Sequence, residues 1–178
     1  MDSVKILQNY INPDTQLYNI VYTHSRCVAD KALSLAMKHP ELSIDCVFLE
    51  EAALIHDIGI FKTNAPDIQC FGANPYICHG FLGRKIVEEE GYPRHALVCE
   101  RHTGTGLSLS VILNENLPLP HRDMMPMSLE EKLISFADKF FSKSRLNEEF
   151  KLSEVRSKLG KYGSEVVNRF DEWCELFM

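Results

Sequence analysis

The amino-acid sequence predicts an all-α protein, and three observations support this. Apolar residues recur at three- and four-residue spacing through most of the chain, which is the period of a helix that buries one face. No segment alternates apolar and polar residues for long enough to predict a sheet. The 178 residues suffice for one domain with a core but are too few for two. We therefore expect a single domain over residues 1–178, with its core at about 15–146 and a C-terminal helix at about 151–177.

The spacing predicts six helices, at about 15–38, 45–58, 77–90, 93–102, 128–142 and 151–177. Residues typical of helix N-termini precede three of them, namely Asp14, Asp45 and Ser128. Glycines stop the second and third helices and interrupt the last one, at positions 59, 91, 160 and 163.

Two long connections separate these helices, at 61–76 and at about 103–127. The first is rich in Asn, Pro and Gly, and the second is long enough to contain one short helix. Because long loops in a compact domain tend to carry function, we expect both connections to lie near a site.

The composition excludes some classes of function. A net charge of −6 argues against general nucleic-acid binding and against an anionic membrane surface. It leaves open a small phosphorylated substrate, since a pocket can be cationic inside an acidic protein. The N-terminus lacks a signal-peptide pattern and no apolar stretch reaches the length of a membrane span, so we expect a cytoplasmic protein. The six cysteines form no C-x-x-C pair, and we expect reduced, buried thiols. The sequence leaves open whether the protein forms a homodimer.

The inner faces of the predicted helices carry residues that can bind metal. Four histidines and two aspartates share these faces or adjoin them: His24, His56, Asp57, His79, His102 and Asp138. A buried carboxylate without a cation costs several kcal/mol, and the flanking core residues supply no cation. Side chains that converge from facing helices can satisfy one another around metal ions.

These residues resemble the H…HD…D signature of the HD superfamily of metal-dependent phosphohydrolases. The stretch HDIG at 56–59 is similar to the extended motif of one large branch. Three further segments resemble those of branches that bind two metals: His79-Gly80 with Gly83, the stretch RHTG at 101–104, and ADK at 137–139. The resemblance runs from about residue 20 to residue 146. Two groups resemble the chain best, the bacterial HD-fold diadenosine tetraphosphate hydrolases and uncharacterised HDIG hydrolases.

The resemblance implies an HD-domain helical bundle with a metal site between helices and two divalent ions. His24, His56, Asp57 and Asp138 would hold the first ion, and Asp57 would bridge to a second, completed by His79 and His102. His56 and Asp57 would be the catalytic pair. Imidazole and carboxylate ligands without thiolate suit iron, manganese, cobalt or zinc. The implied reaction is hydrolysis of a phosphate ester or anhydride in a nucleotide-like small molecule by a metal-activated hydroxide.

The sequence indicates the substrate contacts less clearly than the metal ligands. Many HDIG proteins carry a lysine directly after the motif, where this chain has Ile60, and the nearest lysine is Lys62. The candidate phosphate contacts are Lys62, Arg26, Arg101 and Lys139; each could instead be a solvated surface charge. We expect the remaining histidines, His39, His95 and His121, at the surface. Phe170 and Trp173 are expected as core or interface anchors.

Two other functions fit the same ligand set. One is a di-iron HD-fold oxygenase that activates oxygen, and the other is a ligand-sensing module with an inactive metal site. The presence of all six ligands argues against an inactive site. Assays of phosphate-ester cleavage against oxygen consumption distinguish the two enzymes.

Overall fold

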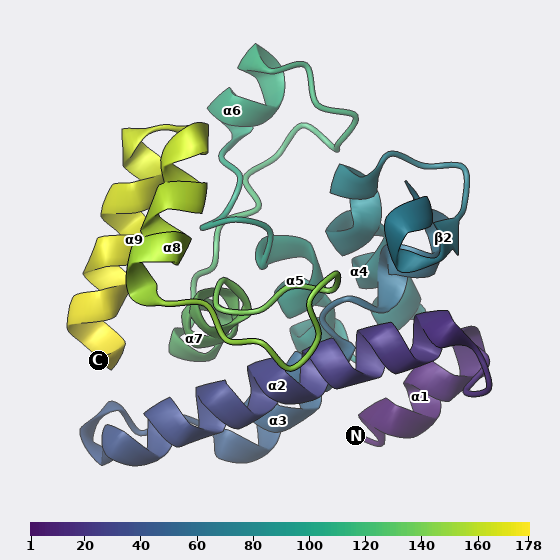
Figure 1. Ribbon diagram of the computed structural model, residues 1–178, viewed down its shortest axis with the longest axis horizontal. Helices are drawn as coiled ribbons and strands as arrows, with labels where there is room; N and C mark the ends of the chain where they lie inside the picture. The colour runs from purple at the N-terminus through teal and green to yellow at the C-terminus, as the bar shows by residue number, and fades with distance from the viewer.

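The protein is built almost entirely of helices, as the periodicity predicts (Figure 1). We describe it from a computed structural model of residues 1–178. The α-helices are α1 (Ser3–Tyr10), α2 (Gln16–Lys38), α3 (Cys46–Ile55), α4 (His79–Glu89), α5 (Pro93–Arg101), α6 (Leu109–Asn114), α7 (Leu129–Asp138), α8 (Leu152–Leu159) and α9 (Ser164–Phe177). Short 3-10 helices include η2 (Ile58–Lys62) and η4 (Tyr76–Cys78). The strands β1 (Asn64–Ala65) and β2 (Cys70–Phe71) form a small antiparallel pair inside the 61–76 connection, although no strand was predicted there.

The long helix α2 lies along one side of the molecule with α3 beside it, and α8 and α9 lie side by side at one end (Figure 1). Thr15, not Asp14, caps α2, because its hydroxyl accepts the Tyr18 backbone N–H at 3.2 Å. The other two expected caps are confirmed: Asp45 accepts from Phe48 N and Ser128 from Glu131 N.

Several helices are shorter than the periodicity predicts. The second ends at Ile55, so His56 and Asp57 lie in the turn before η2. The helix α7 ends at Asp138 and not at about 142. The C-terminal segment divides into α8 and α9 around the glycines that were expected to interrupt it. The short helix α6 occupies the second long connection, whereas α1 was not predicted.

Two large hydrophobic clusters form most of the core, and α2 contributes to both; a third, smaller cluster contains Ile112 and Met124. The first half of the α2 face, with Ile20 and Val21, packs in a cluster with α1, α4 and α5. The second half, from Val28 onward, packs with α3, α7 and α9. His24 and Ser25 are buried between these two stretches and belong to neither cluster.

Some expectations about individual side chains need correction. Phe170 and Trp173 are core residues, as expected. His95 is buried against Glu51 (3.1 Å), so the expectation of a surface position was wrong. Cys46 is exposed, so not every thiol is buried, and all the cysteines are free. No helix combines the length and the apolar character that a membrane crossing requires.

Candidate metal centre

The six expected ligands converge where the two hydrophobic clusters meet. His24 lies in the middle of α2, and His56 and Asp57 follow α3. The other three stand at helix ends: His79 is the first residue of α4, His102 follows α5, and Asp138 is the last residue of α7. All are buried except Asp138, whose side chain is 11% exposed.

Glycines allow the backbones that carry these ligands to approach one another closely. A Cβ atom on Gly59 would lie 2.2 Å from the carbonyl oxygen of His79 and 2.3 Å from the backbone nitrogen of Gly83. A Cβ atom on Gly80 would lie 2.6 Å from the carbonyl oxygen of Cys99. No other residue type fits these contacts without a backbone shift. The glycines of the HDIG and HG-x-x-G segments therefore hold η2, α4 and α5 together around the site.

The two carboxylate oxygens of Asp57 face two different groups of nitrogens. Oδ2 lies 3.3 Å from His24 Nε2 and 3.0 Å from His56 Nε2. Oδ1 lies 3.5 Å from His79 Nε2 and 3.4 Å from His102 Nε2. Asp57 therefore lies between the pair His24 and His56 and the pair His79 and His102.

Asp138 joins the group on the Oδ2 side. Its Oδ1 lies 2.9 Å from His24 Nε2 and 3.7 Å from His56 Nε2. On the other side, the Nε2 atoms of His79 and His102 lie 3.0 Å apart. Two sets of three residues have ligand atoms close enough to share an ion: His24, His56 and Asp138, and His56, Asp57 and His102.

Backbone carbonyls orient three of the imidazole rings. The Nδ1 atoms of His56, His79 and His102 lie within hydrogen-bonding distance of the carbonyl three residues earlier, at 2.6, 2.8 and 2.8 Å. If each Nδ1 donates its proton to that carbonyl, Nε2 is left as a lone-pair donor directed into the site. This orienting contact is typical of histidines that bind metal.

The site contains buried polar atoms that the protein itself does not satisfy. His56 Nε2 and Oδ1 of Asp57 have no hydrogen-bond partner, whereas Oδ2 of Asp57 has an ion pair with Lys143. Unpartnered buried groups of this kind cost free energy unless a ligand pairs with them. Imidazole and carboxylate donors suit a divalent cation. The buried thiol of Cys99 is directed elsewhere, donating to the Ile55 carbonyl at 3.5 Å. The residues therefore fit the expected metal group.

A largely buried lysine completes the charge balance of the centre. Lys143 Nζ lies 2.6 Å from Asp57 Oδ2 and 3.3 Å from His24 Nε2, and its side chain is 11% exposed. Burial lowers the pKa of Lys143, but Asp57 opposes this and the net shift is upward, so the ammonium stays charged. Burial raises the pKa of Asp57, yet His56 and Lys143 hold it well below its usual range.

His56 and His79 differ in their charge. Burial lowers the pKa of His56, but the nearby Asp57 and Asp138 carboxylates overcome this and raise it to about 9. Burial and the neighbouring His102 lower the pKa of His79 to about 3, so this imidazole stays neutral at physiological pH. A neutral imidazole is the form that binds metal.

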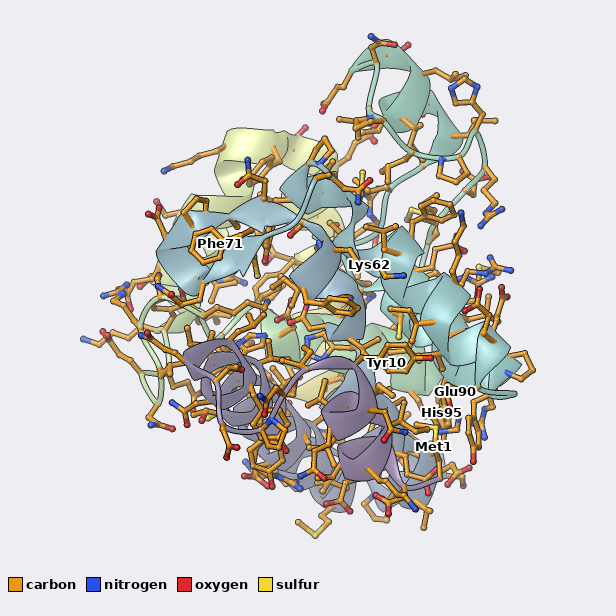
Figure 2. All side chains as sticks on the ribbon, turned by 90° about the vertical axis from the view of Figure 1, so that its right-hand side faces the viewer. Met1, Tyr10, Lys62, Phe71, Glu90 and His95 are labelled. Carbon is orange, nitrogen blue, oxygen red and sulfur yellow. The ribbon has the colours of Figure 1, made fainter.

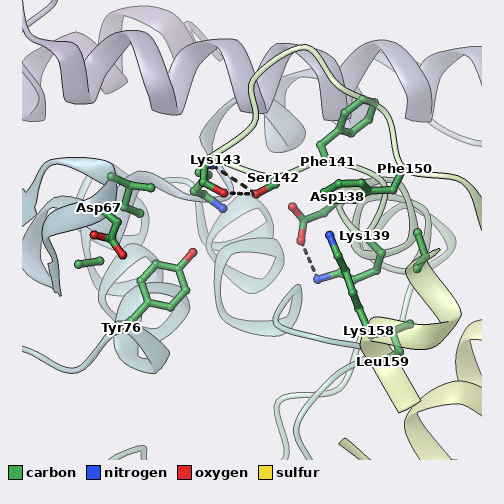
Figure 3. A pocket seen from close by; sticks show the side chains of 14 residues that line it. Asp67, Tyr76, Asp138, Lys139, Phe141, Ser142, Lys143, Phe150, Lys158 and Leu159 are labelled. Carbon is green, nitrogen blue, oxygen red and sulfur yellow. Dashed lines mark hydrogen bonds and ion pairs between the residues drawn. The ribbon is translucent and has the colours of Figure 1, made fainter. Parts of the chain in front are cut away.

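A cavity of about 470 Å³ adjoins the centre at Asp138 (Figure 3). Its charged lining residues are three lysines, Lys139, Lys143 and Lys158, and two aspartates, Asp67 and Asp138, and its wall also includes Tyr76. Lys139 Nζ lies 2.6 Å from Asp138 Oδ2. In a protein with a net charge of −6, lysines outnumber aspartates in the lining of this cavity beside the ligands.

Of the four expected phosphate contacts, only Lys139 lines this cavity. Arg26 is paired with Asp30 and Glu50 at 2.6 and 2.7 Å. Arg101 donates two 3.0 Å hydrogen bonds to Glu131. Lys62 lies on the face that also carries Tyr10 and Glu90 (Figure 2), with its Nζ 5.7 Å from the Phe61 ring centroid. The expected substrate roles of Arg26, Arg101 and Lys62 therefore receive no support from this geometry.

Three residues beside the centre, Lys143, Tyr76 and Lys158, were not predicted from the sequence. Lys143 lies five residues after Asp138, and one lysine among several charges in that segment gives no periodic signal. Tyr76 stacks on His79 with ring centroids 4.8 Å apart, and Lys158 enters from α8, which the sequence does not link to the ligands. The only available signal for Tyr76 was its position in the long connection just before His79.

Residues 21–142, which include all six ligands, match the family model of the HD domain. This chain belongs to the HD domain family. An uncharacterized protein of Methanocaldococcus jannaschii is 31% identical over 145 residues, which cover 79% of this chain and 78% of that protein. The crystal structure of the HD domain of the L. monocytogenes phosphodiesterase PgpH shares the fold, with a TM-score of 0.54 at 15% identity, covering 96% of this HD chain and 94% of that one.

Two tRNA (cytidine(56)-2'-O)-methyltransferases also match this HD protein over part of their length. The protein from Picrophilus torridus is 32% identical over 108 residues, which cover 57% of this chain and 28% of that protein. The one from Thermoplasma volcanium is 27% identical over 143 residues, covering 80% and 37%. Because this chain spans well under half of either methyltransferase, the match concerns only a part of those proteins.

Proposed function

We propose that this HD protein is a metal-dependent phosphohydrolase that cleaves a phosphate ester or anhydride in a nucleotide-like small molecule. One observation carries the proposal: a buried group of four histidines and two aspartates, with unpartnered ligand atoms, opens into a lysine-lined cavity. Membership of the HD family supports the reaction class. The intact HDIG motif supports placing the protein in that branch.

The ligand positions support two metal ions. His24, His56, Asp57 and Asp138 would hold one, and His79 and His102 would hold the other with Asp57 between them. Bound divalent ions would supply positive charge to a phosphoryl oxygen and lower the pKa of water at the site. The nitrogen and oxygen donors favour iron, manganese, cobalt or zinc.

The chain's own residues bind and orient the phosphate. The Lys139 and Lys143 ammonium groups approach the site from the cavity side and would contact phosphate oxygens. Hydrogen bonds between charged groups of this kind are stronger than those between neutral groups. Tyr76 stands in the cavity wall. Burial raises the pKa of its hydroxyl and the nearby Lys143 only partly offsets this. The Tyr76 hydroxyl therefore stays protonated and can donate a proton to the leaving oxygen when the bond to phosphorus breaks.

A screen tests this function. Protein loaded with iron, manganese or cobalt is incubated with a panel of phosphorylated metabolites, and phosphate release and oxygen consumption are both measured. We expect phosphate release that depends on metal and is lost in Asp57→Asn, while His121→Ala, an exposed histidine outside the site, keeps full activity. Oxygen consumption without phosphate release would replace the proposal by an oxygenase.

A further inference from the structure

The three lysines of the cavity are not equivalent. Lys139 is paired with Asp138 and Lys143 with Asp57, so both neutralise carboxylates of the metal centre. Lys158 forms no ion pair with any acidic residue, although it lines the same cavity. The positive charge of Lys158 therefore remains unpaired after Lys139 and Lys143 have neutralised Asp138 and Asp57.

The surroundings of Lys158 position its amine but provide no anionic partner for it. Its Nζ lies 3.0 Å from the centroid of the Phe150 ring, which also lines the cavity. Burial, and then the neighbouring Arg145, lower the pKa of Lys158, because no anion offsets them fully. In Figure 3 the side chains of Lys158 and Lys139 approach from different directions, and both amine ends lie toward Asp138.

The rest of the cavity suits a ligand with an apolar part. Half of its lining residues are apolar, among them Ile68, Phe141 and Leu159. Its volume of about 470 Å³ falls within the range of sites that enclose small organic molecules. A lone orthophosphate would leave most of this space empty, whereas a nucleoside carrying linked phosphates would use both the lysines and the apolar wall.

We propose that Lys158 binds a second phosphate of the substrate, so that the cavity selects molecules with two or more linked phosphates over monophosphates. This inference rests on the proposed function, because it places the first phosphate at the metal centre beside Lys139 and Lys143. Lys158 is then a specificity-determining residue: it recognises the part of the substrate that the metal ligands do not reach.

Equilibrium binding to the metal-loaded protein tests the inference without using turnover. The probes are adenosine monophosphate and α,β-methylene adenosine diphosphate, measured by titration calorimetry at physiological ionic strength, with metal content determined before and after. In Lys158→Gln we expect about fivefold weaker binding of the diphosphate, the effect of one partly exposed charge pair, and less than about twofold change for the monophosphate. Lys161→Gln removes another exposed charge, one that does not line the cavity, and should change neither affinity.

The outcomes separate this inference from the proposed function. Equal affinity of the two probes for the wild-type protein, or equal diphosphate affinity in Lys158→Gln and Lys161→Gln, overturns the role of Lys158 even if the enzyme hydrolyses phosphate esters. Selective, Lys158-dependent binding of the diphosphate in a protein that hydrolyses nothing supports the subsite and rejects the reaction. Because Lys158 is exposed, its variant should melt as the wild type does, and this is checked first.

Discussion

Removal of the Lys143 charge should destabilise the protein strongly when metal is absent and weakly when it is present. Lys143→Met keeps an unbranched side chain of similar length but leaves the fully buried Asp57 without its lysine, 2.6 Å away. Removing one partner of a buried pair costs about 3–5 kcal/mol. We take about 3 kcal/mol, because His56, with a pKa of about 9, supplies a second positive charge at neutral pH. In a chain of this size that corresponds to a melting temperature about 6–12 °C lower.

Differential scanning calorimetry of four samples checks this reasoning: wild type and Lys143→Met, each with chelator and with saturating metal. With metal bound, the ion supplies the charge that Asp57 needs, so the two proteins should melt within about 2 °C of each other. Lys161→Met, at an exposed site, controls for the loss of a lysine. An equal drop with and without metal would show that Lys143 contributes by packing alone and would refute the charge argument.

Three further predictions concern the ligands and their supports. His79→Ala should lower the metal content to about one ion per chain, whereas Asp57→Asn should lose both ions. Elemental analysis measures this, and two ions per chain in His79→Ala would contradict a second metal position at His79. Gly59→Ala should lower the free energy of unfolding, measured in urea, by more than about 2 kcal/mol, because its Cβ would lie 2.2 Å from the His79 carbonyl oxygen. Gly160→Ala is the control and should leave the stability unchanged, because no atom lies within 4 Å of the added Cβ. In metal-free protein, the folded pKa of His56, about 9, exceeds its ordinary 6.5, so its contribution is complete below pH 6.5 and is lost as the pH rises through 9. Urea midpoints across this range should fall, and a flat profile would contradict the assignment.

Much of the metal centre could be predicted because its ligands obey local rules. Helical periodicity placed His24, His79 and Asp138 on inner faces, and the HDIG motif marked His56 and Asp57. The structure brings all of them together with His102. Helix ends were less well predicted. The helix α7 ends at Asp138, where the chain turns toward Lys143, and an apolar pattern that continues through Phe141 conceals that turn.

The residues that escaped prediction depend on tertiary contacts. Lys143, Tyr76 and Lys158 come from three separate segments, and no spacing in the sequence indicates that they line one cavity. His95 was placed at the surface because its burial depends on Glu51, which is distant in sequence. Arg101 was expected to contact phosphate because its partner Glu131, which accepts two hydrogen bonds from it, is also distant in sequence.

The position of His24, between the two hydrophobic clusters, has a consequence for how the protein opens. Each cluster can lose its packing as a separate cooperative unit, and α2 is an element that both share. An ion held jointly by α2, by the turn after α3 and by α7 ties the opening of one unit to that of the other. Amide hydrogen exchange should therefore be nearly uniform across both clusters in the metal-loaded protein. After chelation it should separate into two classes, divided along α2 at His24.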